Sequence, residues 1–194
     1  MIRLIIASSI LISSINSYSQ RMIEWDGVYQ LQLSDFQSPT TQIGDVTIFG
    51  LYMGAGMDFA YAMSSGEFML TKNFNSKVTC SFKPQQSSII APDSVIALEI
   101  LNFARYNFDL NELYSRKLRK RLYDSKGAFS NVNFFQPVYD QTQAELTERN
   151  AIASKETNLG RNTERLIMFH EEVLKGIKDL PDFCKTCKPQ KRKK

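Results

Sequence analysis

Residues 98–122 read LEILNFARYNFDLNELYSRKLRKRL, and this stretch decides the fold. Asp93 and Ser94 lie just before it, and such side chains accept hydrogen bonds from the unpaired N–H groups of a first helical turn. Gly127 is typical of a residue that follows a helix. The stretch therefore predicts one long helix around which the chain is organised. Its large apolar side chains fall at helical spacing: Leu98, Leu101, Phe108, Leu118 and Leu122.

Two further helices are expected in the second half of the chain. One helical pattern covers residues 137–158 and another covers residues 161–179. Gly160 separates the two patterns and Pro181 ends the second, because neither residue type continues a helix easily.

The first half of the chain consists of short β-forming runs separated by Gly, Ser and Asn. No helical pattern separates the runs, so their connections are too short for parallel crossovers and favour an antiparallel meander. We predict an α+β fold, in which an antiparallel β-sheet is packed by one long helix and two further helices. The expected strands are residues 28–33, 45–52, 57–63, 67–71, 77–82 and 129–135.

Composition is that of a globular protein. Of the 194 residues, 43% are apolar and 23% are charged, so disorder is not expected. The formal net charge of +4 is small and is concentrated in residues 116–121 and 185–194. Nucleic acid binding needs a broader basic face, often interleaved with aromatic residues, so we expect no nucleic acid partner.

The N-terminus has the pattern of an export signal. Arg3 supplies a positive start, residues 4–15 are mostly apolar, and Ser17 and Ser19 supply small residues before a cleavage point. The alternative is an uncleaved, weakly held membrane anchor, although the apolar run is shorter than the roughly 20 residues of a membrane span. We predict a signal peptide over residues 1–19, a single α+β domain over residues 20–183 and a basic tail over residues 184–194. The protein would then be secreted or periplasmic.

Export would place the three cysteines in an oxidising compartment. Cys184 and Cys187 have the spacing of a redox motif, but they follow Pro181 in a basic tail and not a strand-to-helix turn. Two pairings are open. Either Cys184 and Cys187 form a local disulfide, or Cys80 pairs with one of them.

Residues in the middle of the long helix stand where a zinc-binding motif would be expected, but they are not the residues of that motif. In H-E-x-x-H, two His one turn apart bind zinc and the Glu activates the bound water. Residues 103–107 read FARYN, and residues 108–118 continue FDLNELYSRKL. The continuation resembles a family of predicted secreted bacterial zinc-dependent proteases, a domain of unknown function whose helix runs H-E-Q-x-H-F-D-x-x-E-x-x-A-R-x-L. Residues 34–39 and 80–88 are similar to shorter segments of that family.

The resemblance implies a zincin-like fold and identifies the positions where the zinc ligands would stand. Phe103 and Asn107 replace the two His, and Ala104 replaces the Glu. The family's later E-T-x-H-G segment corresponds to residues 156–160, so Leu159 replaces the third His. Phe and Leu offer no lone pair, an Asn amide is a poor zinc ligand, and Ala cannot accept a proton. We therefore assign no catalytic residue, metal or cofactor, and expect apolar packing at the former metal site.

The function expected from these replacements is that of an exported, catalytically inactive zinc-protease-like protein. It would have a binding or structural role in the cell envelope, with a protein or an envelope component as its partner. The alternative is an active secreted hydrolase, a peptidase, that uses an unrecognised site.

Four other polar residues are candidates for a functional role. His170, the only histidine, falls on the apolar stripe of its helix and is expected to be a packed, hydrogen-bonded core residue. Carboxylate oxygens of the kind that bind metal ions are present on Asp109, Glu112 and Glu156. Carboxylates so spaced on helices are more often solvated or paired with Arg, so we assign them no metal.

The basic run on the long helix has two readings. In the first, it makes weak contact with anionic lipid head groups or acidic glycans. In the second, which we favour, it is a solvated helix face. The residues concerned are Arg116, Lys117, Arg119, Lys120 and Arg121.

Overall fold

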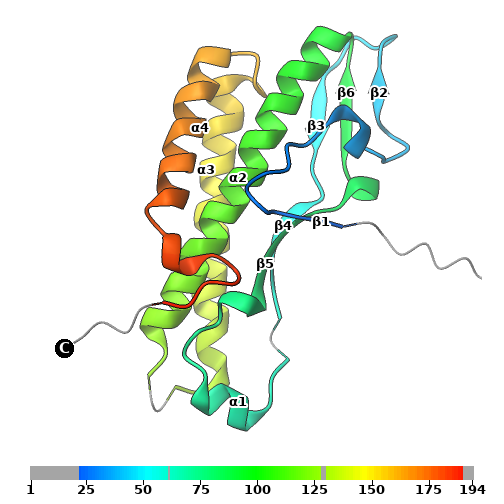
Figure 1. Ribbon diagram of the computed structural model, residues 1–194. Helices are drawn as coiled ribbons and strands as arrows, with labels where there is room; N and C mark the ends of the chain where they lie inside the picture. Colours follow the sequence, from blue (N-terminus) through cyan, green and yellow to red (C-terminus); the bar gives the residue numbers. More distant parts are fainter. Residues whose placement is uncertain (1–21, 61, 128–129, 190–194) are drawn as a thin grey trace, which may run out of the picture.

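The fold was analysed in a computed structural model that describes residues 22–60, 62–127 and 130–189 (Figure 1). Three long helices lie side by side on one flank, and short strands form a layer against the green central helix, α2. The predicted α+β class, with a largely antiparallel strand layer packed by one long helix and two further helices, is confirmed. The predicted leader, residues 1–19, lies outside the described residues.

The strand layer consists of two three-stranded sheets, with orders β1-β5-β4 and β2-β6-β3. Their pairs are antiparallel except β2–β6, which is parallel. Residues 50–59 pair with residues 78–90 across both sheets, from Gly50 opposite Ile90 to Phe59 opposite Val78. The sheets are therefore two halves of one long interrupted hairpin with an extra strand on each half. The strands are β1 (Ile23–Glu24), β2 (Gln42–Ile43), β3 (Gly50–Tyr52), β4 (Ala55–Phe59), β5 (Val78–Phe82) and β6 (Ser88–Ala91).

The strand predicted at residues 28–33 is wrong. The Asp26 carboxylate accepts hydrogen bonds from the backbone N–H groups of Val28 and Tyr29, at 2.8 and 2.7 Å, so the chain turns there. Within residues 45–52 only β3 is a strand, because Gly44 and Asp45 have positive φ angles and form a turn.

Two other strand predictions are also wrong, and one strand was not predicted. Residues 67–71 fall largely in helix α1 (Ser65–Leu70), because the Ser64 hydroxyl caps its first turn by accepting the N–H of Glu67 at 3.1 Å. Residues 132–134 form a 3₁₀ turn that leads into helix α3. Strand β6 is short and lies close to proline on both sides, which hides its pattern.

Helix α2 (Ser94–Ser125) is the predicted long helix and is longer than its apolar pattern. Asp93 caps it by accepting the N–H of Ile96 at 2.9 Å. One face of α2, including Leu101 and Ala104, packs on the strands, and another, including Phe103 and Leu110, packs on the later helices. The helix is therefore covered on both sides and forms the centre of the core.

Helices α3 (Phe135–Thr157) and α4 (Thr163–Lys178) are the two predicted later helices. The turn between them rests directly on α2. Asn158, Leu159 and Gly160 have φ angles of 52°, 54° and 96°, so three successive residues adopt left-handed conformations. A Cβ atom on Gly160 would lie 2.3 Å from the carbonyl oxygen of Glu99. Only glycine fits this close approach.

Replacing Gly160 with alanine is expected to destabilise the fold by about 2 kcal/mol or more. The new methyl group meets the α2 backbone at a φ angle that side chains avoid. Denaturant unfolding of Gly160→Ala measures the loss. Gly56→Ala is the matched control, because a Cβ atom there meets nothing within 4 Å, and a change within about 0.5 kcal/mol is expected. Equal losses in both variants would contradict the close contact.

Candidate functional site

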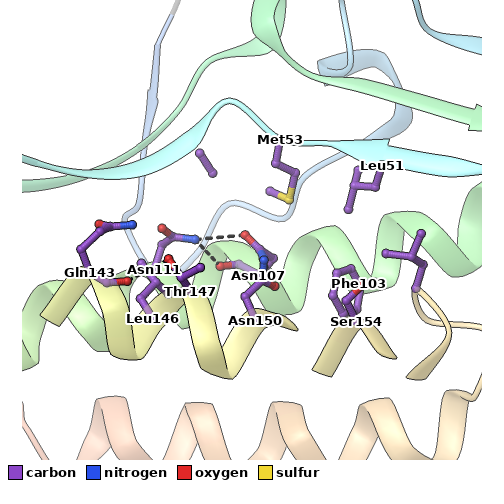
Figure 2. Close-up of a pocket in the computed structure, with 12 residues that line it drawn as sticks. Leu51, Met53, Phe103, Asn107, Asn111, Gln143, Leu146, Thr147, Asn150 and Ser154 are labelled. Carbon is purple, nitrogen blue, oxygen red and sulfur yellow. Dashed lines mark hydrogen bonds between the residues drawn. The ribbon is translucent and has the colours of Figure 1, made fainter. Parts of the chain in front are cut away.

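The three residues predicted to stand where a relative would have its zinc-binding histidines line one pocket of about 270 Å³ (Figure 2). Phe103 and Asn107 reach it from α2, and Leu159 reaches it from the turn after α3. Ala104, at the position of the Glu, is fully buried against the strands and does not line the pocket. The structure therefore brings together three of the four predicted positions.

Regular spacing in three elements builds the pocket walls. Residues 103, 107 and 111 lie one turn apart on α2 and share a face. Leu51, Met53 and Ala55 alternate along the strand that passes above, so their side chains point to the same side. Helix α3 supplies the remaining wall with Gln143, Leu146, Thr147, Asn150 and Ser154.

A chain of hydrogen-bonded amides, from buried Asn111 and Asn107 to partly buried Asn150, crosses the floor of the pocket from α2 to α3. Asn111 Nδ2 donates to the side-chain oxygen of Asn107 at 3.0 Å and to its backbone oxygen at 2.8 Å. Asn107 Nδ2 donates in turn to Asn150 Oδ1. Because buried amides are costly without partners, this chain fixes how the two helices face each other.

Other polar groups of the pocket have no protein partner among the described residues. They are the Gln143 amide, the Asn150 side-chain nitrogen and the Ser154 hydroxyl. These groups can both donate and accept hydrogen bonds, so they are available to a bound molecule.

None of the residues that line this pocket is an acid, a base, a thiol or an imidazole. The Ser154 and Thr147 hydroxyls are weak nucleophiles unless a neighbouring base activates them, and no lining residue supplies one. The pocket can bind a neutral polar group, but its own side chains offer no proton-transfer chemistry.

The strand above the pocket has an unpaired edge. Strands β3 and β4 stand at the ends of their sheets, and each pairs with one neighbour. The Tyr139 hydroxyl donates to the Met57 carbonyl at 3.1 Å and covers the far end of this edge. The stretch from Gly50 to Gly56 borders the pocket and remains partly exposed.

His170 and Asp109 form a hydrogen-bonded pair on the other side of α2. His170 Nε2 lies 2.6 Å from Asp109 Oδ2, and Trp25 Nε1 donates to Asp109 Oδ1 at 2.6 Å. The ring of Tyr106 packs edge-on against the imidazole. His170 is thus hydrogen-bonded as predicted, but it is half-buried and not part of the deep core. Sequence spacing gives no signal for this cluster, because its members are far apart in the chain.

The predicted carboxylates do not gather into a site. Glu112 pairs with Arg116 and Arg119, and Glu156 pairs with Arg165. In the part of the chain that the structure describes, no group of three or more His, Cys, Asp or Glu side chains is placed to hold a metal ion.

The prediction of a solvated basic face on α2 is wrong for Arg116 and Arg119, which are buried. Arg119 is 1% exposed and Arg116 is 8% exposed, and both donate to Glu112 Oε1 at 2.9 Å. Of the others, Lys120 pairs with Asp124 and Arg121 pairs with Glu145. Only Lys117 has no carboxylate partner among the described residues.

The buried arginines hold the C-terminal segment in place. Arg116 donates to the carbonyl oxygens of Ile177 and Leu180, and Arg119 donates to those of Val78 and Phe183, at 2.9–3.3 Å. The cluster therefore ties α2 to a strand and to the chain end through backbone atoms.

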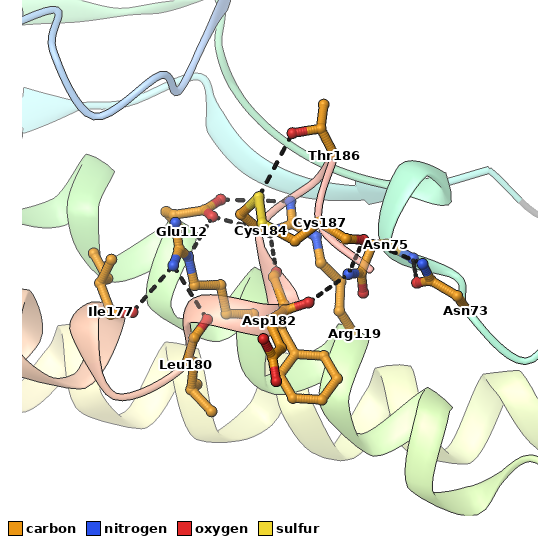
Figure 3. Close-up of a disulfide and its surroundings, with 12 residues drawn as sticks. Asn73, Asn75, Glu112, Arg119, Ile177, Leu180, Asp182, Cys184, Thr186 and Cys187 are labelled. Atoms are coloured by element: carbon orange, nitrogen blue, oxygen red, sulfur yellow. Dashed lines mark hydrogen bonds and ion pairs between the residues drawn. A yellow bond between two sulfur atoms is a disulfide. The ribbon is translucent and has the colours of Figure 1, made fainter. Parts of the chain in front are cut away.

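The structure contains the local disulfide, Cys184–Cys187 (Figure 3). Asn73 and Asn75 donate to the Cys187 carbonyl at 3.1 and 2.9 Å. Cys80 is a free, buried thiol whose pKa is raised by burial. Residues 184–187 are thus packed on the domain, whereas residues 190–194 of the predicted tail lie outside the described residues.

Comparisons with protein-family models, with curated proteins and with solved structures found no match. Along the described residues, no helix has both the length and the apolar character needed to cross a bilayer.

Replacing Glu112 with alanine is expected to lower the free energy of unfolding by about 3–5 kcal/mol, because two buried guanidinium groups lose their counter-ion. Glu156→Ala is the control, since it removes an exposed carboxylate that also pairs with Arg, and a loss of at most about 1 kcal/mol is expected. Denaturant unfolding of both variants gives the comparison. A loss below 1 kcal/mol in Glu112→Ala would contradict the structural role of the cluster.

Proposed function

We propose that this protein is an exported, catalytically inactive relative of zinc-protease-like proteins that binds an extended, uncharged peptide segment. The observation that carries the proposal is the lining of the pocket at the former ligand positions. It combines unpartnered amides with apolar side chains and contains no titratable group.

An extended peptide fits the unpaired strand edge above the pocket. Peptide backbones bind exposed edges by adding a strand, through main-chain hydrogen bonds. The edge from Gly50 to Gly56 has such groups, and the Gln143 and Asn150 amides below it can bind polar atoms of the same ligand.

The size of the pocket favours part of a long ligand over a whole small one. Its volume of about 270 Å³ is slightly below that of pockets that enclose drug-sized molecules, about 300–1,000 Å³. Phe103, Leu146 and Leu159 provide an apolar place for one side chain of the ligand. The absence of charge among the lining residues favours an uncharged residue at that point.

Export is supported by the predicted leader and by the disulfide, because disulfides persist mainly in oxidising compartments. A binding role is favoured over hydrolysis because Asp109 and Glu112, the carboxylates nearest the motif, are already held by protein partners. The partner would then be a protein with an extended segment or another envelope component.

Filling the pocket is expected to abolish peptide binding. Purified protein is screened on an array of unmodified peptides, and the affinity for selected peptides is measured by fluorescence anisotropy. Ser154→Phe should weaken binding at least tenfold, because its ring occupies the space of the ligand side chain. Gln141→Ala, which removes an exposed amide on the same helix outside the pocket, should leave binding unchanged. Peptides that bind Ser154→Phe as well as the parent protein, or an array on which no peptide is bound, would reject the proposal.

The proposed ancestry is tested by restoring the ligands. The triple variant Phe103→His, Asn107→His and Leu159→His is expected to bind one Zn²⁺ at least tenfold more tightly than the Phe103→His, Asn107→His double variant. The reason is that a third imidazole completes a three-ligand site in the shared pocket. Competition against a colorimetric zinc chelator gives both affinities, and circular dichroism checks the fold. Equal affinities would show that Leu159 does not stand at a ligand position.

A further inference from the structure

A second cavity, of about 420 Å³, lies between α2 and α4. Its floor is apolar, and Gly176 lets α4 approach Leu113, since a Cβ atom there would lie 2.9 Å from Leu113 Cδ1. The volume falls within the range of small-molecule sites, about 300–1,000 Å³. Apolar residues of the floor are Leu110, Leu113, Val173 and Leu180.

The rim carries a cation without a counter-ion. Lys117 has no carboxylate within ion-pair distance among the described residues, and its ammonium group lies 4.0 Å above the Tyr114 ring. Burial lowers the pKa of Lys117, and the charges of Arg121 and Arg149 lower it further, against the opposing effect of Glu145. An anion bound at this point would offset the free-energy cost of removing the ammonium group from water.

Further hydrogen-bond donors lie beside Lys117. Tyr114 lines the cavity, and its hydroxyl has no hydrogen-bond partner among the described residues. The Tyr106 hydroxyl is buried close to Arg149 and Tyr114 and does not line the cavity. Burial raises the pKa of Tyr106 to about 12, so the hydroxyl remains a donor at neutral pH.

The acidic groups of the rim do not cancel this arrangement. Glu172 already pairs with Arg149, and Glu145 pairs with Arg121. Asp179 is exposed at the end of α4, where water screens its charge. The side of the cavity near Lys117 therefore offers donors and positive charge above an apolar floor.

We propose that this cavity binds an amphipathic carboxylate, a molecule with one carboxylate group and an unbranched or compact apolar body. The carboxylate lies against Lys117 and the Tyr114 hydroxyl, and the apolar body lies on the floor between α2 and α4. This site is separate from the peptide pocket, because helix α3 stands between the two and they share no lining residue.

Decanoate below its micelle concentration is the probe, titrated into purified protein by isothermal calorimetry. One site per chain is expected, and decanol should bind at least tenfold more weakly because it lacks the charge that Lys117 needs. Lys117→Met should weaken decanoate binding at least tenfold, and Lys117→Arg should retain most of the affinity for decanoate. Lys120→Met removes an exposed lysine that already pairs with Asp124 and should have no effect.

A fourth variant separates this site from the peptide pocket. Ser154→Phe should leave decanoate binding unchanged, and thermal unfolding checks that every variant is folded. Four outcomes would overturn the proposal: no decanoate binding at millimolar concentration, equal affinity of Lys117→Met and the parent protein, several weak sites per chain, or loss of binding in Ser154→Phe.

Discussion

Helix α2 carries apolar side chains on more than one face, so it cannot lie at the surface. Each of the three buried clusters of the core includes part of it. The strands cover one face, α3 and α4 cover another, and the hairpin end with α1 covers Leu118 and Leu122 near its C-terminus. The positions of the other elements follow from the need to exclude water from all of these faces.

The buried polar residues of α2 need hydrogen-bond partners, and they find them in two different ways. Glu112 accepts hydrogen bonds from Arg116 and Arg119, and the two guanidinium groups also donate to backbone carbonyls. That cluster is closed and structural. Asn111 donates to Asn107, which donates to Asn150, but these bonds lie at a pocket where other amides remain unpartnered. A fully paired polar group stabilises a fold, whereas an unpaired one beside a cavity is available for binding.

Helix α3 separates two cavities with different chemistry. On the strand side, neutral amides and an unpaired strand edge suit main-chain atoms. On the α4 side, Lys117 and the Tyr114 hydroxyl above an apolar floor suit an anionic amphipath. The contrast arises because the same helices present amides on one face and aliphatic and basic residues on the next.

The long helix, the two later helices and the Gly160 turn could be predicted from the sequence, because caps and helical spacing act between residues close in the chain. The shared location of Phe103, Asn107 and Leu159 was anticipated only through a family resemblance. Strand predictions failed where a short side chain such as Asp26 hydrogen-bonds the local backbone.

Sequence by itself thus determined the three long helices and the α+β class of this protein. Only the tertiary structure decided the parallel β2–β6 pair, the cluster of Trp25, Asp109 and His170, and which basic residues of α2 are buried. Each of these depends on contacts between segments far apart in the chain. Such contacts form because α2 must be covered on more than one face, and no local pattern encodes which partner covers which face.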